Sequence, residues 1–223
     1  MLTARNNAKL NAMENFTYVL RDKDGNVKKL WQENKLGTLL LRTLRKLTPN
    51  PVATITAANG EVTGSYVKEG ILNKLAAYGL RVPVLTGNYV TELRLANLVT
   101  NAGLAGIASR INGDGSEAVF NYIAIGTGAV AAAAANTTLG TEITTGGGAR
   151  AAATVSRTTT TVTNDTPRFV KTFTFTAGFA VTEAGVLNAA SSGTLLNRQV
   201  FSAVNVESSD TLQITVDLAL ADA

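Results

Sequence analysis

A strict alternation near the C-terminus constrains the fold of this chain more than any other feature. Leu212, Ile214, Val216, Leu218 and Leu220 occupy every second position, and most of the residues between them are polar. A period of two places one side of a strand against a core and the other toward solvent. A single strand cannot bury that apolar side, so the segment predicts a β-sheet.

Several further segments of the C-terminal half have the composition of strands and are separated by turn residues. The predicted strands are Val119–Ile125, Arg150–Val162, Phe169–Ala177, Val181–Ala189 and Leu195–Phe201. Short strands at close spacing are typical of sandwiches and barrels. We therefore expect residues 112–223 to form an antiparallel β-sandwich or barrel-like domain, which begins at the flexible break Asn112–Gly115.

The first half of the chain has a mixed pattern. Residues 1–15 are polar and rich in Asn, which predicts an extended arm that orders on contact with a neighbour. Phe16–Leu20 alternates as a strand, and Asp22–Asn26 supplies the Asp-Gly chemistry of a hairpin turn. A returning strand at Val27–Trp31 follows, and Val52–Thr63 predicts a second hairpin.

Helical spacing is also present in this region. Lys35–Leu47 follows a cap residue, Asn34, and places five leucines on one helical face: Leu36, Leu39, Leu40, Leu44 and Leu47. Val67–Leu80 and Leu104–Ile111 are compatible with short helices. We therefore expect residues 16–111 to be a mixed α/β attachment region with hairpins and amphipathic helices. The predicted fold class of the whole chain is α+β, mainly β.

The charge is concentrated at the N-terminal end. The net charge is +4, and residues 1–50 hold ten Lys and Arg against four Asp and Glu. A basic front end indicates attachment to an acidic partner, although a solvated helical face explains the same pattern. The candidate assembly contacts are Trp31, Lys35, Arg42, Arg45 and Lys46.

The composition excludes several kinds of chemistry. The chain has no Cys and no His, so disulfides, thiol catalysis and Ser-His-Asp systems are excluded. We predict no enzyme activity, no cofactor and no metal. Gly126-Thr127-Gly128 lacks the remainder of a phosphate-binding motif and indicates a structural turn. Glu183 lies in an apolar strand, where burial demands a partner such as Arg198 or Arg157.

The N-terminus does not have the pattern of a signal peptide, and no apolar run is long enough to cross a bilayer. We expect no membrane association. Trp31 and Tyr18 accompany the basic residues but form no stacking platform, so nucleic-acid binding is not expected either.

Ordered blocks of residues between about 93 and 220 resemble a family of virion structural proteins of tailed bacteriophages. The blocks are Asn97–Gly103, Ala108–Gly113, Tyr122–Gly128, Asn136–Glu142, Phe179–Ala189, Gly193–Leu196, Arg198–Phe201 and Asp210–Leu212. The resemblance implies no active site. It implies a structural subunit that is made in the host cytoplasm, ends in the virion, and has other virion proteins as partners. The low share of charged residues, 16%, and the abundance of small residues predict in addition that the chain forms a homo-oligomer.

Three roles remain open within that setting. The resemblance favours a subunit of the tail, neck or fibre apparatus, docked through the basic N-terminal region. A capsid-decorating cement protein is the first alternative, and a host-surface glycan-binding module is the second. Sugar platforms need exposed Trp or Tyr, and the chain after residue 119 has only Tyr122.

Overall fold

The structure is a computed structural model that describes residues 10–33, 52–56, 62–67, 85–90, 92–96 and 98–222. The chain divides into two compact units. The larger combines Met1–Lys28 with Arg94–Ala223, and the smaller is Lys29–Leu93.

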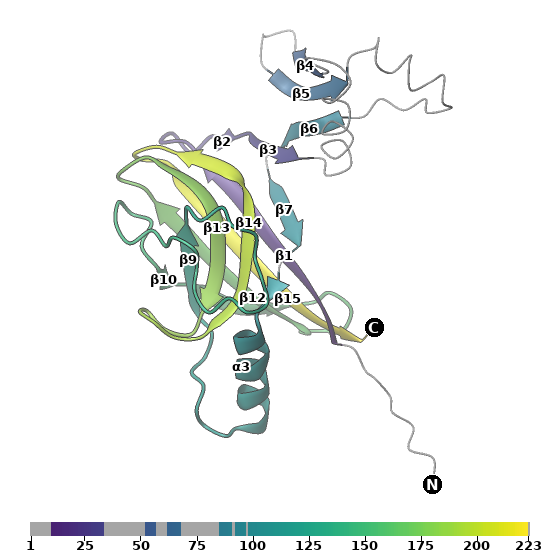
Figure 1. The fold of residues 1–223 in the computed structure, drawn as a ribbon, viewed down its shortest axis with the longest axis vertical. Helices are drawn as coiled ribbons and strands as arrows, with labels where there is room; N and C mark the ends of the chain where they lie inside the picture. Colours follow the sequence, from purple (N-terminus) through teal and green to yellow (C-terminus); the bar gives the residue numbers. More distant parts are fainter. Residues whose placement is uncertain are drawn as a thin grey trace, which may run out of the picture. The chain divides into compact units, whose positions relative to one another are not determined.

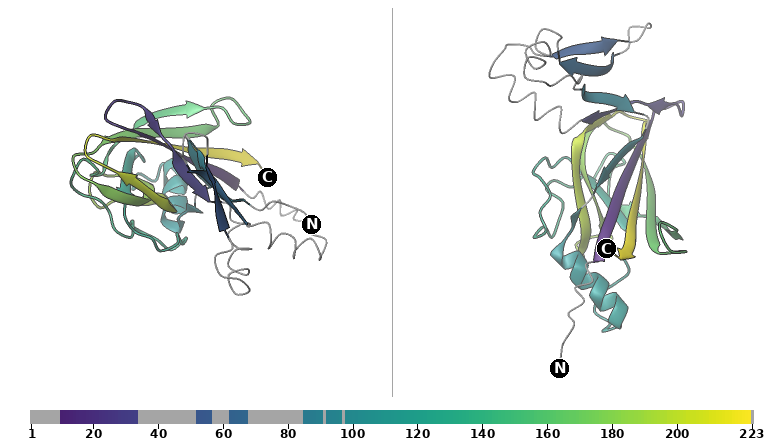
Figure 2. Two further views of the ribbon diagram at one scale, coloured as in Figure 1. Left: turned by 90° about the horizontal axis from the view of Figure 1, so that it is seen from above. Right: turned by 90° about the vertical axis from the view of Figure 1, so that its right-hand side faces the viewer.

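The larger unit contains two antiparallel sheets, which Figures 1 and 2 show stacked face to face as a sandwich. The first sheet has the order β11-β12-β15-β1-β2, with β7 also paired to β1, and the second has the order β10-β9-β13-β14-β8. The strands of the first sheet are β1 (Leu10–Arg21), β2 (Val27–Lys28), β7 (Leu93–Ala96), β11 (Thr154–Thr158), β12 (Thr166–Thr174) and β15 (Thr211–Asp222). The strands of the second are β8 (Leu98–Val99), β9 (Tyr122–Gly126), β10 (Ala151–Ala152), β13 (Phe179–Leu187) and β14 (Leu195–Val206).

The alternating C-terminal segment is the central strand β15 of the first sheet, and its register explains the core. Phe16, Val216 and Phe169 lie side by side on β1, β15 and β12, and all three are buried. Leu212 lies in the same way between Leu20 and Phe173. Matched apolar rows on three strands fix the register, because a slip of one residue would turn every row toward solvent.

The N-terminal strand belongs to the C-terminal domain, which corrects two predictions. β1 pairs with β15 over its whole length, from Leu10 opposite Asp222 to Arg21 opposite Thr211. Residues 10–15 are therefore part of a sheet within the chain and not of an arm that orders on a neighbour. The boundary at residue 112 is also wrong, because the larger unit includes both Met1–Lys28 and the chain from Arg94 onward.

The one helix among the described residues, α3 (Asn101–Asn112), begins three residues before the predicted start. Thr100 caps it: its Oγ1 accepts a hydrogen bond from the Gly103 N–H (2.9 Å). Gly113 ends the helix in the left-handed conformation, at φ 69°. The predicted break at Asn112–Gly115 is thus the C-terminal cap of a helix that belongs to the same unit.

The first hairpin turn is confirmed. The Asp22 carboxylate accepts hydrogen bonds from the N–H groups of Asp24 and Asn26 (both 2.9 Å), and Gly25 has φ 84°. The positive φ explains why the turn requires glycine. The returning strand is split into β2 and β3 (Leu30–Glu33).

The smaller unit contains a four-stranded sheet with the order β3-β6-β5-β4, formed by β3, β4 (Val52–Thr56), β5 (Val62–Val67) and β6 (Leu85–Val90). β4 and β5 pair antiparallel, as expected for the second hairpin, although its turn lies outside the described residues. The predicted helix at Lys35–Leu47 and most of the one at Val67–Leu80 also lie outside them.

The fold class is therefore mainly β, with antiparallel sheets. Between the two predicted architectures of the C-terminal half, the described residues form a sandwich of two separate sheets and not a closed barrel. The long strand predicted at Arg150–Val162 is two short strands, since the chain passes from the second sheet to the first at Ala153.

Candidate assembly surface

The loop between β9 and β10 covers the outer face of the second sheet, and one buried carboxylate holds it there. Glu183 lies on β13 directly opposite Gly126 of β9, and its side chain is completely buried. Leu139 and Ile143 of the loop are buried as well, and Leu139 packs against Ala124. We call Thr127–Thr145 the covering loop.

The Glu183 carboxylate accepts three hydrogen bonds from the main chain. Its Oε1 accepts from the N–H groups of Gly128 (2.9 Å) and Thr141 (2.7 Å), and its Oε2 accepts from the Gly140 N–H (2.8 Å). Oε2 also accepts from Nε of Arg198 (2.8 Å), which is 2% exposed. The two ends of the covering loop are therefore tied to one side chain on the sheet beneath it.

Glycine is required where the main chain approaches this carboxylate. A Cβ added at Gly126 or Gly128 would collide with the Glu183 side chain, and one at Gly140 would meet the Arg198 guanidinium. The Gly128 N–H of the Gly-Thr-Gly sequence thus binds an anion, but that anion is a carboxylate of the same chain. The predicted turn is not present: Gly126 ends β9, and the Thr127 N–H continues the pairing by donating to the Thr141 carbonyl.

The environment of Glu183 keeps it ionised. Burial raises the pKa of this carboxyl, but the N–H groups of Thr141 and Gly140 and the Arg198 guanidinium outweigh burial, so its pKa lies below the ordinary value of 4.5. The carboxylate accepts four hydrogen bonds, which occupy both of its oxygens. This arrangement suits a structural ion pair and leaves no lone pair directed at a substrate.

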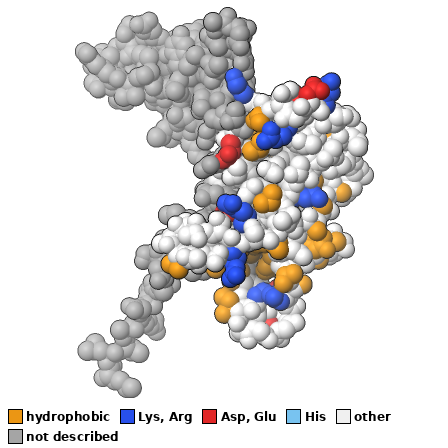
Figure 3. Space-filling model, turned by 180° about the vertical axis from the view of Figure 1, so that it is seen from behind, with side chains coloured by type: hydrophobic (Ala, Val, Ile, Leu, Met, Phe, Trp, Pro, Cys, Tyr) orange, Lys and Arg blue, Asp and Glu red, His pale blue; other side chains and the backbone are white. Residues whose placement is uncertain are grey.

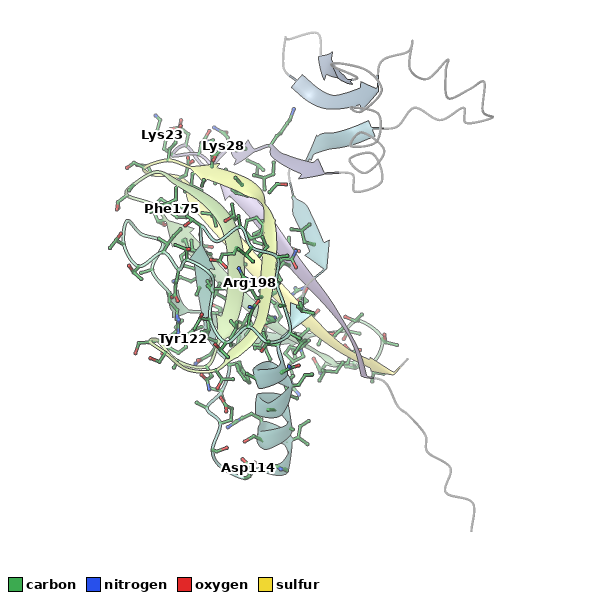
Figure 4. The ribbon with its side chains drawn as sticks, viewed as in Figure 1. Lys23, Lys28, Asp114, Tyr122, Phe175 and Arg198 are labelled. Carbon is green, nitrogen blue, oxygen red and sulfur yellow. The ribbon has the colours of Figure 1, made fainter. Side chains whose placement is uncertain are left out.

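Arg198 extends the support along the loop. Its Nη1 donates to Oδ1 of Asn136 (3.0 Å) and its Nη2 donates to the Val130 carbonyl (3.1 Å). Asn136 Oδ1 also accepts from the Ala133 N–H (2.8 Å). Figure 4 shows Arg198 about halfway along the length of the sandwich, and it reaches the loop from β14.

The segment that these bonds hold is apolar and exposed. Ala129–Ala135 contains only Ala and Val, and Val130 is 79% exposed. We call it the alanine segment. Alanine side chains bury too little area to order a loop by themselves, so its conformation depends on the polar supports beneath it.

Helix α3 adjoins the alanine segment. The Asn101 N–H donates to the Ala134 carbonyl (2.8 Å), and Thr100 donates through N–H and Oγ1 to carbonyls of β14. On the helix, Leu104 and Ile111 are 50% and 80% exposed although they are large and apolar. Figure 1 shows α3 projecting from one end of the sandwich, and Figure 4 places Asp114 at its far tip.

Together, the alanine segment and the exposed side of α3 form the candidate assembly surface. Exposed apolar side chains that are held in place by a rigid scaffold are characteristic of contact sites between proteins. On the face seen from behind, Figure 3 shows hydrophobic side chains interspersed with basic ones and with uncharged polar groups.

None of the sequence-predicted contacts is among the residues that define this surface. Trp31 is in β3, opposite Tyr89 of β6, and belongs to the smaller unit. Lys35, Arg42, Arg45 and Lys46 lie outside the described residues, so their role stays a prediction.

Sequence reasoning identified the burial of Glu183 and named two possible partners. The structure selects Arg198, whereas Arg157 is exposed on β11. The three main-chain donors were missed. Gly126, Gly128 and Gly140 were the available signal, because glycines near a buried carboxylate permit close approach of backbone N–H groups.

Comparison with known proteins gives no relative: no family model, curated protein or solved structure matches the chain. In the described part of the chain, no helix is long and apolar enough to cross a membrane. The same residues contain no cluster of three or more acidic side chains that could hold a metal ion.

Proposed function

We propose that this chain is a non-enzymatic structural subunit of a tailed-bacteriophage virion, and that it belongs to the tail, neck or fibre apparatus. One observation carries the proposal. Four of the residue blocks that resemble phage virion proteins meet at Glu183, and together they build a support for an exposed loop.

The contributions of the four blocks are specific. Tyr122–Gly128 and Asn136–Glu142 supply main-chain donors, Phe179–Ala189 supplies Glu183, and Arg198–Phe201 supplies Arg198. What these blocks have in common is the positioning of an apolar surface segment. A positioned apolar segment on the surface suits a protein that functions by contacting other subunits.

In this role the assembly surface contacts a neighbouring virion protein, and the basic N-terminal region docks on a second, acidic one. Val130 and Ile111, at 79% and 80% exposure, are the side chains with most apolar area to lose on contact. Because the N-terminal strand β1 is held in the larger unit, the docking residues are those that follow it, in and after β3.

The proposal is tested by locating the protein. Purified virions of the encoding phage are separated into heads and tails, and each fraction is analysed by mass spectrometry. We expect the protein in the tail fraction. Its presence in heads alone would support capsid decoration instead, and its absence from both fractions would refute a structural role in the virion.

A complementation experiment tests the surface itself. Val130→Asp places a charge on the alanine segment, and Val27→Asp makes the same change on the first hairpin, where Val27 is 37% exposed. We expect both proteins to fold with the wild-type melting temperature but only Val27→Asp to restore infective particles. Equal rescue by the two variants would show that the alanine segment is not a contact.

A further inference from the structure

The strand β11 forms an open edge of the first sheet. It pairs with β12 from Thr154 opposite Val170 to Thr158 opposite Thr166, and no described residue forms a strand on its other side. The opposite edge of the same sheet is formed by two shorter strands, β2 and β7, which both pair with β1.

The direction of the free main-chain groups follows from two hydrogen bonds. The Ala153 N–H donates away from β12, to the Asn121 carbonyl (2.8 Å), and N–H directions alternate along a strand. The Asp165 carbonyl accepts from the Leu220 N–H, so the main-chain groups of Asp165 point toward β15. Because these directions alternate along the strand, the main-chain groups of the even-numbered residues of β12 point toward β11. Both observations direct the N–H and C=O groups of Val155 and Arg157 outward.

The side chains of β11 leave this edge unprotected. Natural proteins block open edges with proline, several charges, a bulge or a covering segment. β11 has the sequence Thr-Val-Ser-Arg-Thr, with Arg157 as its single charge. Val155 lies opposite the buried Phe169, on the core side of the sheet, yet it is 55% exposed. A strand added here would cover that side chain.

We infer that β11 pairs with β11 of a second copy of this chain, antiparallel about a two-fold axis through Ser156. This inference does not depend on the virion setting, and it concerns a strand edge that is not part of the candidate assembly surface. In three registers of such a pair, the outward main-chain groups of one strand lie opposite those of the other. The two-fold axis passes through Val155, Ser156 or Arg157 in these registers.

The charges and the hydrogen bonds select among the three registers. Centring on Arg157 sets like charges directly opposite each other, which is destabilising. Centring on Val155 sets Arg157 opposite Ala153, whose N–H is already bonded to Asn121. Centring on Ser156 sets Val155 opposite Arg157 in two hydrogen-bonded pairs.

The Ser156 register also matches side chains on the outer side of the sheet. It sets Thr154 opposite Thr158 and Ser156 opposite its own copy, and facing hydroxyl residues form favourable cross-strand pairs. A pair of five-residue strands is smaller than a standard interface, so the dimer alone is weak. Attachment of several copies to one particle would strengthen it through effective concentration.

Cysteine cross-linking tests the register, because the chain has no cysteine of its own. In the proposed pair, Ser156 faces its copy at a non-hydrogen-bonded position, where the Cα separation of about 4.5 Å is within disulfide range. We expect Ser156→Cys to form a covalent dimer under mild oxidation of the full chain. Val162→Cys is the control for random collision, since Val162 is 67% exposed in the loop after β11.

Sedimentation velocity at increasing protein concentration tests the association without a cross-link. Val155→Pro removes an outward N–H that makes no bond to β12, so we expect an intact fold but loss of the dimer. Its circular dichroism spectrum and melting temperature check the fold. The inference is overturned if the wild-type chain stays monomeric at every concentration, or if Ser156→Cys cross-links no faster than Val162→Cys.

Discussion

Replacement of Glu183 by glutamine tests whether the buried carboxylate holds the covering loop. The substitution keeps the size and shape of the side chain but exchanges one acceptor oxygen for an NH₂ group. In the wild type each oxygen accepts two hydrogen bonds: Oε1 from Gly128 and Thr141, and Oε2 from Gly140 and Arg198. Either orientation of the amide therefore turns its NH₂ group toward two donors.

The expected cost follows from burial. Glu183 is 0% exposed and Arg198 is 2% exposed, so the variant leaves the guanidinium charge in the interior without its counter-ion. Removal of one partner of a buried ion pair costs about 3–5 kcal/mol of folding free energy. The two unpaired N–H donors act in the same direction.

The assay is urea unfolding of the full chain, followed by far-ultraviolet circular dichroism, with the free energy obtained by linear extrapolation. Asp217→Asn is the matched control. Arg168 donates through Nε and Nη2 to the two oxygens of Asp217 (both 2.7 Å), but the Arg168 side chain is 39% exposed. Solvent screens this pair, so we expect the control to cost about 0.2–1 kcal/mol.

The losses of unfolding free energy in the two variants are compared to decide whether Glu183 holds the covering loop. If Glu183→Gln costs no more than Asp217→Asn, the carboxylate does not hold the loop and the reasoning on the candidate surface fails. Limited proteolysis gives a second measurement, in which cleavage within Ala129–Ala135 should be faster in Glu183→Gln at concentrations of urea that leave the sheets folded.

Three further predictions concern the same region. The pKa of Glu183 is lower in the folded than in the unfolded chain, so its stabilising contribution is complete above the ordinary value of 4.5 and disappears as the pH falls through the folded value. We therefore expect the difference in unfolding free energy between wild type and Glu183→Gln to shrink on acidification below pH 4.5, and a difference that grows would contradict the assignment. Thr100→Val removes the helix cap and the donor to the buried Leu195 carbonyl; we expect a loss of about 0.5–2 kcal/mol in urea unfolding, with no loss as the refuting result. Gly103→Ala sets a methyl group against the backbone of Leu196, so we expect a lower melting temperature although alanine favours helix by about 1 kcal/mol, and a higher one would show that α3 does not pack so closely.

The strands were predictable where periodicity alone determines them. The alternation of β15 and the buried phenylalanines of β12 each place one side of a strand in the core, and both predictions are confirmed. The turn at Asp22–Asn26 was also predictable, because a positive φ at Gly25 is a local requirement.

The partners of the strands were not predictable. Phe16–Leu20 indicated a strand, but its pairing with β15 joins residues nearly the whole chain apart. Local composition contains no information about that pairing, and closing such a long loop adds little entropic cost, since the cost grows only with the logarithm of length. For this reason the domain boundary drawn from composition was misplaced.

The Glu183 site was predictable only in part, because the partners of Glu183 also depend on which strands pair. A carboxylate that is buried in an apolar strand needs a cationic partner, and the sequence offered two candidates, Arg198 and Arg157. The register of β13 against β14 sets Glu183 opposite Val200 and Gly185 opposite Arg198, which places Arg198 on the neighbouring strand within hydrogen-bond reach of Glu183. Only the sheet geometry distinguishes this residue from Arg157, which lies in the other sheet.

The presence of a buried ion pair in this place requires an explanation beyond stability. Well-packed apolar side chains of similar volume often stabilise a fold as much as a buried pair does, or more. An apolar pair could not, however, bind the N–H groups of Gly128, Gly140 and Thr141, nor reach the Val130 carbonyl as Arg198 does. The charged pair therefore serves the conformation of the covering loop, whose exposed Ala129–Ala135 would otherwise have little reason to keep one shape. A fixed shape in an exposed apolar segment suits a partner that must fit it, and this is the physical basis for the proposal that the chain serves in assembly.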